Sequence, residues 1–146
     1  MVRSKAASYA IMAMVEIAER TRGEQPSDLQ AGEIAGRLGL PMAYTAKVLS
    51  QLARASLLRS DRGPRGGFQL AREPDQISLL QILQAVGAWS EGELPLPEAA
   101  SPKVRRSVNE AIQRAVRQAH EVLDSVYLSS LVTKDQPVLQ GAGAPS

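Results

Sequence analysis

The stretch DRGPRGGFQLAR at residues 61–72 decides the fold that the sequence predicts. Its glycines let the backbone turn sharply and approach a partner closely, and Pro64 stiffens the turn. Short apolar runs on either side, at 57–60 and 68–70, predict a two-stranded β-hairpin. The basic side chains in or beside this hairpin are Arg59, Arg62, Arg65 and Arg72. A rigid loop tipped with arginines suits a nucleic-acid groove better than a packed core.

The residues before the hairpin predict two short helices joined by a tight turn. The sequence AGEIAGRL at 31–38 has the apolar spacing of a helix, and Gly39 closes it as a left-handed cap residue would. Pro41 stands where proline is favoured, in the first turn of a third helix that extends to about residue 56. A helix-turn-helix followed by a hairpin is a winged helix.

Two further helices complete the predicted N-terminal domain, residues 1–87. Apolar spacing places them at about residues 4–19 and 79–86, and Ser78 is a suitable N-cap for the second. The predicted fold class is therefore mainly α with a small β-hairpin: a winged helix-turn-helix domain followed by a long C-terminal helix.

The C-terminal part predicts a dimerisation segment. Residues 88–101 form an irregular acidic loop rich in proline, and a long helix follows from Pro102 to about Leu123. Its apolar residues make one continuous stripe, which at the end of a small domain usually needs a partner helix. The expected dimer contacts are Val104, Val108, Ile112, Ala115, Val116, Ala119 and Val122.

The last residues predict little further structure. Asp124 and Ser125 are expected to cap a short helix within VYLSSLV at 126–132, which ends the dimerisation segment 102–132. The tail 133–146 is expected to be disordered.

Charge and composition narrow the function. Residues 1–72 carry eleven basic and six acidic side chains, whereas residues 73–101 carry five acids and no Lys or Arg. A basic N-terminal half fits an anionic partner. The absence of cysteine excludes disulfides, zinc fingers and thiolate-bound iron–sulfur clusters. No long apolar run is present, so we expect no membrane span and a cytoplasmic protein.

The third helix offers a candidate recognition surface. Ala43, Tyr44, Lys47 and Gln51 lie on its polar face, near the helix end that a recognition helix points into the major groove. Lys47 can contact guanine or a phosphate, and Tyr44 can bond a phosphate or touch a thymine methyl. The alternative interpretation, a solvated helix face, is weakened by the basic hairpin that follows.

Other chemistry finds little support. His120 is the only histidine, and a metal site needs several ligands, so we expect no metal and no cofactor. No nucleophile–base arrangement is recognisable, so we expect no enzyme. Two alternatives stay open: a winged-helix module that binds proteins instead of DNA, and a haem or small-molecule sensor built around Trp89 and His120.

Three segments resemble the IscR/NsrR/CymR-type winged-helix transcription regulators of bacteria, the Rrf-two family. SKAASYAIMAM at 4–14 resembles the family's first helix, and ISLLQILQAV at 77–86 resembles the helix after its wing. Residues 31–72 resemble its helix-turn-helix and wing, including the run Arg-Gly-Pro-x-Gly-Gly-aromatic-x-Leu. The resemblance implies a regulator that binds a pseudo-palindromic double-stranded DNA operator as a homodimer, and we expect a repressor.

The resemblance also implies roles for single residues. Arg62 would enter the minor groove, Arg65 makes the wing more basic than usual, and Lys5 and Tyr9 belong to a segment that supports a contact to the DNA backbone. The recognition helix corresponds to Ala43, Tyr44, Thr45, Ala46 and Lys47. Several relatives have polar residues at the two alanine positions, so their operator sequence does not carry over.

One part of the family pattern is missing. Many relatives hold an iron–sulfur cluster on three cysteines between the fourth helix and the long helix, where residues 89–106 of this chain contain none. Cluster sensing is therefore not implied, and a thiol signal is excluded as well. The expected signal is a regulatory protein or a small molecule.

Overall fold

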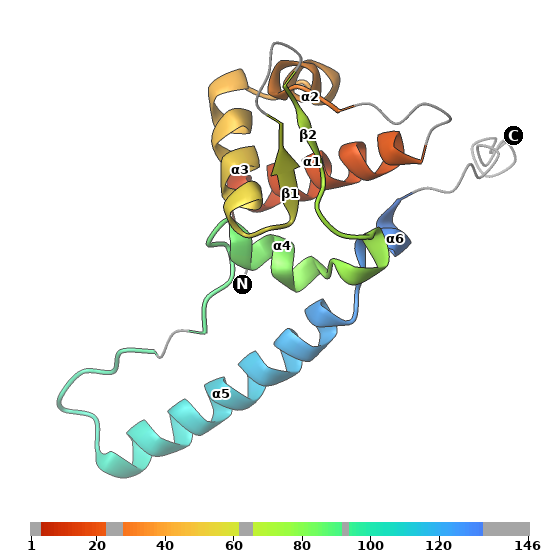
Figure 1. The fold of residues 1–146 in the computed structure, drawn as a ribbon. Coiled ribbons are helices and arrows are strands. Elements are labelled where there is room, and N and C mark those ends of the chain that lie inside the picture. Colours follow the sequence, from red (N-terminus) through yellow and green to blue (C-terminus); the bar gives the residue numbers. More distant parts are fainter. Residues whose placement is uncertain (1–3, 23–27, 62–65, 92–93, 133–146) are drawn as a thin grey trace, which may run out of the picture.

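The structure, a computed structural model, describes residues 4–22, 28–61, 66–91 and 94–132. They form a mostly helical fold with one two-stranded antiparallel hairpin, as the sequence predicts (Figure 1). The elements in chain order are α1 (Lys5–Thr21), α2 (Ala31–Leu38), α3 (Met42–Arg54), β1 (Leu58–Ser60), β2 (Phe68–Leu70), η1 (Pro74–Gln76), α4 (Leu79–Ala85), α5 (Pro102–Asp124) and α6 (Leu128–Leu131).

Helix α1 is the centre of the core. Its buried face consists of alanines together with Met14 and Ile17. Because alanine is small, the neighbouring backbones approach α1 closely, and α2, α3, β2, α4 and α6 all pack against it. The Ser4 hydroxyl caps the helix by accepting a hydrogen bond from the Ala7 N–H.

The helix-turn-helix forms as expected, with one difference in length. Gly39 ends α2 in the left-handed conformation at φ +64°, which confirms its predicted cap role. Helix α3 ends at Arg54, two residues earlier than predicted, because Ser56 takes a positive φ of 60°. This turn lets the Leu57 N–H bond the Leu52 carbonyl and sends the chain into β1.

The hairpin is anchored to the loop before α2. Strands β1 and β2 pair with Leu58 opposite Leu70 and Ser60 opposite Phe68. On its other side, Phe68 exchanges two backbone hydrogen bonds with Leu29, of 2.8 and 3.2 Å. Leu29 is fully buried, so this bridge fixes the base of the wing to the core.

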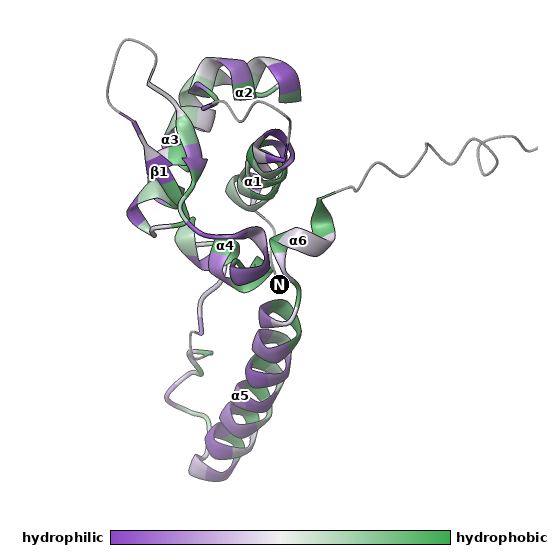
Figure 2. Ribbon diagram, turned by 45° about the vertical axis from the view of Figure 1, so that its right-hand side comes forward, coloured by the Kyte–Doolittle hydropathy of each residue, from purple (hydrophilic) through white to green (hydrophobic). Residues whose placement is uncertain are grey.

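The chain leaves the core after α4 and returns after α5. Ser78 begins α4 with a capping box, in which its hydroxyl accepts from the Gln81 N–H and the Gln81 side chain accepts from the Ser78 N–H. Ser101 caps α5, which projects away from the other helices (Figures 1 and 2). Within the described ranges no helix is long and apolar enough to cross a membrane.

The return segment corrects the predicted cap of the last helix. Tyr127, not Asp124 or Ser125, is the N-cap of α6. Ser125 instead ends α5, where its N–H bonds the Glu121 carbonyl. The chain around Tyr127 then pairs with the segment just before α4, and the Leu128 N–H donates a 2.8 Å hydrogen bond to the Ile77 carbonyl. This backbone pairing takes the place of a side-chain cap at the start of α6.

Gly67 gives a direct test of the wing anchor. A Cβ added there would lie 2.9 Å from the Asp28 Cβ and 3.0 Å from the Leu29 carbonyl atoms. We expect Gly67→Ala to lower the free energy of unfolding by about 1–3 kcal/mol, as overpacking does. Gly36→Ala is the matched control, because a Cβ there meets nothing within 4 Å and the site is an exposed helix position, where alanine stabilises. Urea unfolding of both variants measures this, and equal stabilities would contradict the anchor.

Candidate nucleic-acid interface

Helix α3 buries one face and exposes the other. The buried face repeats every three or four residues and packs into the core. On the opposite side Ala43 and Lys47 are exposed, whereas Tyr44, Ala46 and Gln51 are half-buried. This side carries a cation, a phenol, an amide and two methyl groups, which can bond phosphates, bond base edges and contact thymine methyls.

Thr45 lies on the buried face, which corrects its expected contact with DNA. Its side chain is 1% exposed, and its hydroxyl donates a 2.9 Å hydrogen bond to the Pro41 carbonyl. The spacing of Thr45 from Val48 and Leu49, three and four residues on, is that of a core position. The spacing in the sequence alone therefore favours a buried position for Thr45.

Tyr9 and Tyr44 form an aromatic pair between α1 and α3. Their ring centroids are 5.2 Å apart and the rings are perpendicular, which is a favoured edge-to-face arrangement. Both side chains pack against the core at its edge. Tyr9 therefore orients the Tyr44 ring on the exposed side of α3, a contact that periodicity alone could not predict.

Two described basic residues of the prediction, Lys5 and Arg59, are exposed on elements that pack against α3. Lys5 is exposed in the first turn of α1, which contains no acid. Arg59 is exposed on β1, opposite Gln69 of β2. Arg62 and Arg65, predicted at the tip of the wing, lie outside the described residues.

A carboxylate pair lies at the base of the wing, and the sequence did not reveal it. The pKa of Asp28 is raised above its ordinary value of 3.8, first by a hydrogen bond with Asp61, then by partial burial and by the negative charge of Asp61. The positive charge of Arg59 opposes this shift. Asp61 also accepts a 3.3 Å hydrogen bond from the Gln69 side-chain amide. The two carboxyls thus lie close enough to interact where the loop before α2 meets the wing.

Helix α5 presents the predicted stripe without burying it. No residue of α5 is buried, and Val104 and Val122 are 49% and 63% exposed. Figure 2 shows apolar and polar residues on separate sides of the helix. Among the described elements, α4 is the one against which α5 packs substantially. The stripe is thus open to a second helix.

Side chains of α5 form hydrogen bonds with the segment that precedes the helix. The Arg105 guanidinium donates hydrogen bonds to the Leu96 and Pro97 carbonyls, at 3.2 and 2.8 Å. His120 Nδ1 lies 2.7 Å from Glu91 Oε1. His120, a candidate haem ligand in one of the sequence alternatives, therefore has a carboxylate partner from its own chain.

Comparison with protein-family models matches residues 3–134 to the model named Rrf2, described as iron-dependent transcriptional regulator. The chain belongs to the Rrf2 family. An rrf2-like HTH-type transcriptional regulator of Rhodobacter capsulatus is 29% identical over 142 residues, which cover 94% of this chain and 91% of the relative. IscR of Aliivibrio salmonicida is 33% identical over 78 residues, which cover 53% of this chain and 45% of IscR.

Solved structures agree with this assignment. The structure of CymR, the global cysteine regulator of B. subtilis, superposes with a TM-score of 0.69 at 30% identity, covering 90% of this chain and 95% of CymR. This Rrf2 chain is therefore a winged-helix transcriptional regulator and not an enzyme, as the sequence predicts.

The Rrf2 description names iron, but this chain has no cysteine thiolate that could bind an iron–sulfur cluster. Its 146 residues contain no Cys and one His. Across the described ranges, no three His, Cys, Asp or Glu side chains form a group that could hold a metal. These donors do not fit a thiolate-held iron–sulfur cluster.

The carboxylate pair predicts a specific pH dependence of stability. Because the folded state raises the Asp28 pKa, the folded chain binds more protons than the unfolded chain just above pH 3.8, and stability falls as the pH rises through this range. Asp61→Asn removes the negative charge beside Asp28 and the carboxyl that interacts with it, so the variant should lose this fall. Asp75→Asn, an exposed change on η1, is the control. Unfolding measured from pH 4 to 7 tests this, and parallel profiles for parent and Asp61→Asn would contradict the pair.

Proposed function

We propose that this Rrf2 regulator is a homodimeric repressor that places α3 in the major groove of its operator and the wing in the minor groove. The observation that carries the proposal is the exposed side of α3, where Lys47 and Tyr44 lie next to one another in a frame fixed by the core. In helix-turn-helix proteins, the residues near the start of the second helix contact base edges.

Each residue of the surface then has a role that its chemistry supports. Lys47 bonds a guanine or a phosphate, Gln51 bonds a base edge, and the Tyr44 hydroxyl bonds a phosphate. Ala43 and Ala46 offer methyl groups to thymine. The operator should therefore contain thymines opposite Ala43 and Ala46, because their methyl groups would contact the thymine methyls. Relatives with polar side chains at these two positions would instead form hydrogen bonds with the bases there.

The basic residues around this surface supply affinity and register. Lys5 and Arg59 contact phosphates on either side of the major groove, and Arg62 and Arg65 extend from the wing into the minor groove. Tyr9 contributes indirectly: its ring packs against the Tyr44 ring and holds the Tyr44 side chain in place. Thr45 supports α3 from within.

The dimer forms through the apolar stripe of α5. A helix with half-exposed valines at both ends gains most by pairing with the same stripe of a second copy. Pairing of this kind is two-fold symmetric, so the two α3 helices face a pseudo-palindromic operator. The operator half-sites then lie a whole number of helical turns apart.

The DNA surface can be tested after selecting bound fragments from a genomic library. Lys47→Ala and Arg62→Ala should each weaken binding to the best fragment by about 1–3 kcal/mol and make the salt dependence of affinity shallower. Lys103→Ala is the control, since it removes the same charge from the exposed first turn of α5. Fluorescence anisotropy at several salt concentrations measures all three. Parental affinity in both test variants would refute the assigned surface, and salt-independent binding would favour the protein-binding alternative.

The dimer surface has its own test. Val122→Asp places a charge on a side chain that is 63% exposed in the single chain, so the fold of each chain should survive. A buried charge at a helix pair is costly, so we expect monomers and loss of tight operator binding. Arg117→Asp, on a different side of α5, should leave the dimer intact. Sedimentation equilibrium measures this, and a dimeric Val122→Asp variant would contradict the proposed interface.

A further inference from the structure

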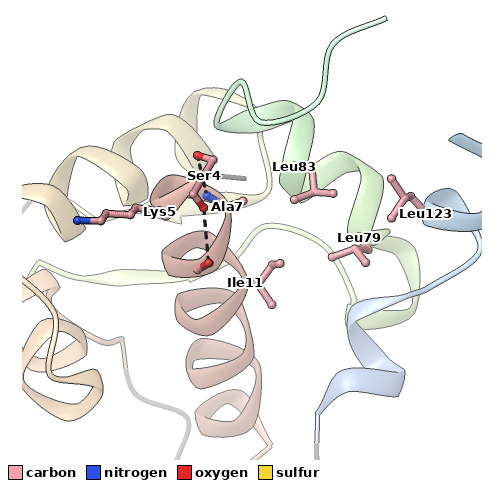
Figure 3. Close-up of a pocket in the computed structure, with 8 residues that line it drawn as sticks. Ser4, Lys5, Ala7, Ile11, Leu79, Leu83 and Leu123 are labelled. Atoms are coloured by element: carbon pink, nitrogen blue, oxygen red, sulfur yellow. Dashed lines mark hydrogen bonds between the residues drawn. The ribbon is translucent and has the colours of Figure 1, made fainter. Parts of the chain in front are cut away.

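A cleft of about 520 Å³ lies where α1, α4 and the end of α5 meet. Its walls are the aliphatic side chains of Ile11, Leu79, Leu83 and Leu123 (Figure 3). Ile11 points from α1 toward the three leucines of α4 and α5. In the single chain this cleft is open to solvent, and its apolar walls suit a small apolar molecule.

The polar groups of the cleft come from the first turn of α1. Ser4 and Ser8 line this end. The Ser8 hydroxyl reaches the Ser4 carbonyl only at 3.5 Å, so it remains able to bond a ligand. Lys5 also borders the cleft, but its ammonium group points away from the leucines (Figure 3). The interior therefore offers hydroxyls and no charge, which favours a neutral ligand over an ionised one.

The cleft lies between the winged domain and the dimerisation helix α5, and the relative position of these two parts matters for DNA binding. Helix α1 carries Lys5 and Tyr9, and Leu123 lies in the last turn of α5. Just beyond it, the Leu79 N–H bonds the Val126 carbonyl at 2.7 Å, so the end of α5 is fastened to the start of α4. A molecule between Ile11 and Leu123 would change the angle at which α5 leaves the winged domain. In a dimer joined through α5, that angle sets the separation of the two α3 helices.

We propose that this cleft binds a small, neutral, mainly apolar molecule with one hydroxyl or carbonyl group, and that its occupancy alters operator affinity. The regulatory half of this inference rests on the proposed function, whereas the binding half does not. A ligand changes DNA affinity only if it binds the two arrangements of α5 with different affinity.

Three matched probes test the binding half in the full-length protein: benzyl alcohol, benzoate and benzylammonium. Methyl-resolved NMR should show saturable shifts at Ile11, Leu79, Leu83 and Leu123 with benzyl alcohol, at a dissociation constant of about 1 mM, ordinary for so small a molecule. The two ions should bind at least about tenfold more weakly, because the cleft must desolvate their charge.

Filling the cleft provides the matched variants. Ser8→Phe and Ser8→Leu add a side chain at its exposed edge and should abolish the benzyl alcohol shifts, while Met12→Phe, at an exposed position one turn further along α1, should keep them. With saturating benzyl alcohol, operator affinity of the parent should change by about fivefold, the lower end of allosteric coupling. The same addition should have no effect on Ser8→Phe.

The outcomes separate the two proposals. Unsaturable or scattered methyl shifts overturn the ligand site, whatever DNA binding does. Saturable shifts with unchanged operator affinity overturn the regulatory half. Conversion of Ser8→Phe to a monomer would mean that a second copy of the chain fills the cleft, which also overturns the inference. A parent that binds no DNA refutes the proposed function while leaving the methyl shifts as a test of the site.

Discussion

The buried alanine face of α1 is the constraint on which the rest of the structure depends. Ala10, Ala13 and Ala18 are fully buried there, and five other elements pack on this one helix. A larger side chain at any of these positions would push α3, the wing strand β2 or α4 outward, because protein interiors have no spare volume. The position of the proposed recognition surface is therefore set by the small size of residues buried in the core.

The same packing positions the polar groups around the surface. The Tyr9–Tyr44 pair connects α1 to the exposed side of α3, and the Glu16–Arg37 ion pair, at 2.8 Å, connects α1 to α2. At the wing, two backbone hydrogen bonds between Leu29 and Phe68 hold β2, with Gly67 close against the chain at Asp28. The described part of the wing is thus held to the core by backbone hydrogen bonds.

The sequence predicted those features that periodicity and backbone chemistry determine locally. Gly39 and Ser78 were recognisable as caps because a left-handed turn favours glycine and a first helical turn favours a hydroxyl. The turn at Ser56 was not, since the residue that takes the positive φ is a serine and not the glycine that usually marks the end of a helix. The cap of α6 was missed for a related reason: pairing of Tyr127 with Ser78 joins segments far apart in the chain.

In the candidate site, too, some features follow from local sequence patterns and others do not. The exposed side of α3 followed from helical spacing, and so should the burial of Thr45 have done. The Asp28–Asp61 pair and the cleft beside Ile11 require residues from separate segments to meet, and no local pattern indicates them. The family resemblance implies which end of the chain binds DNA, but it implies no sensor, because this chain lacks the cysteines on which many relatives rely.

Hydroxyl-radical footprinting on a selected DNA fragment tests the central claim most directly, namely that two α3 surfaces related by a two-fold axis through α5 face one DNA molecule. The account predicts two protected patches related by a dyad, on one side of the duplex, with centres a whole number of turns of about 10.5 base pairs apart. A single asymmetric patch, or two patches out of phase with the helical repeat, would contradict it.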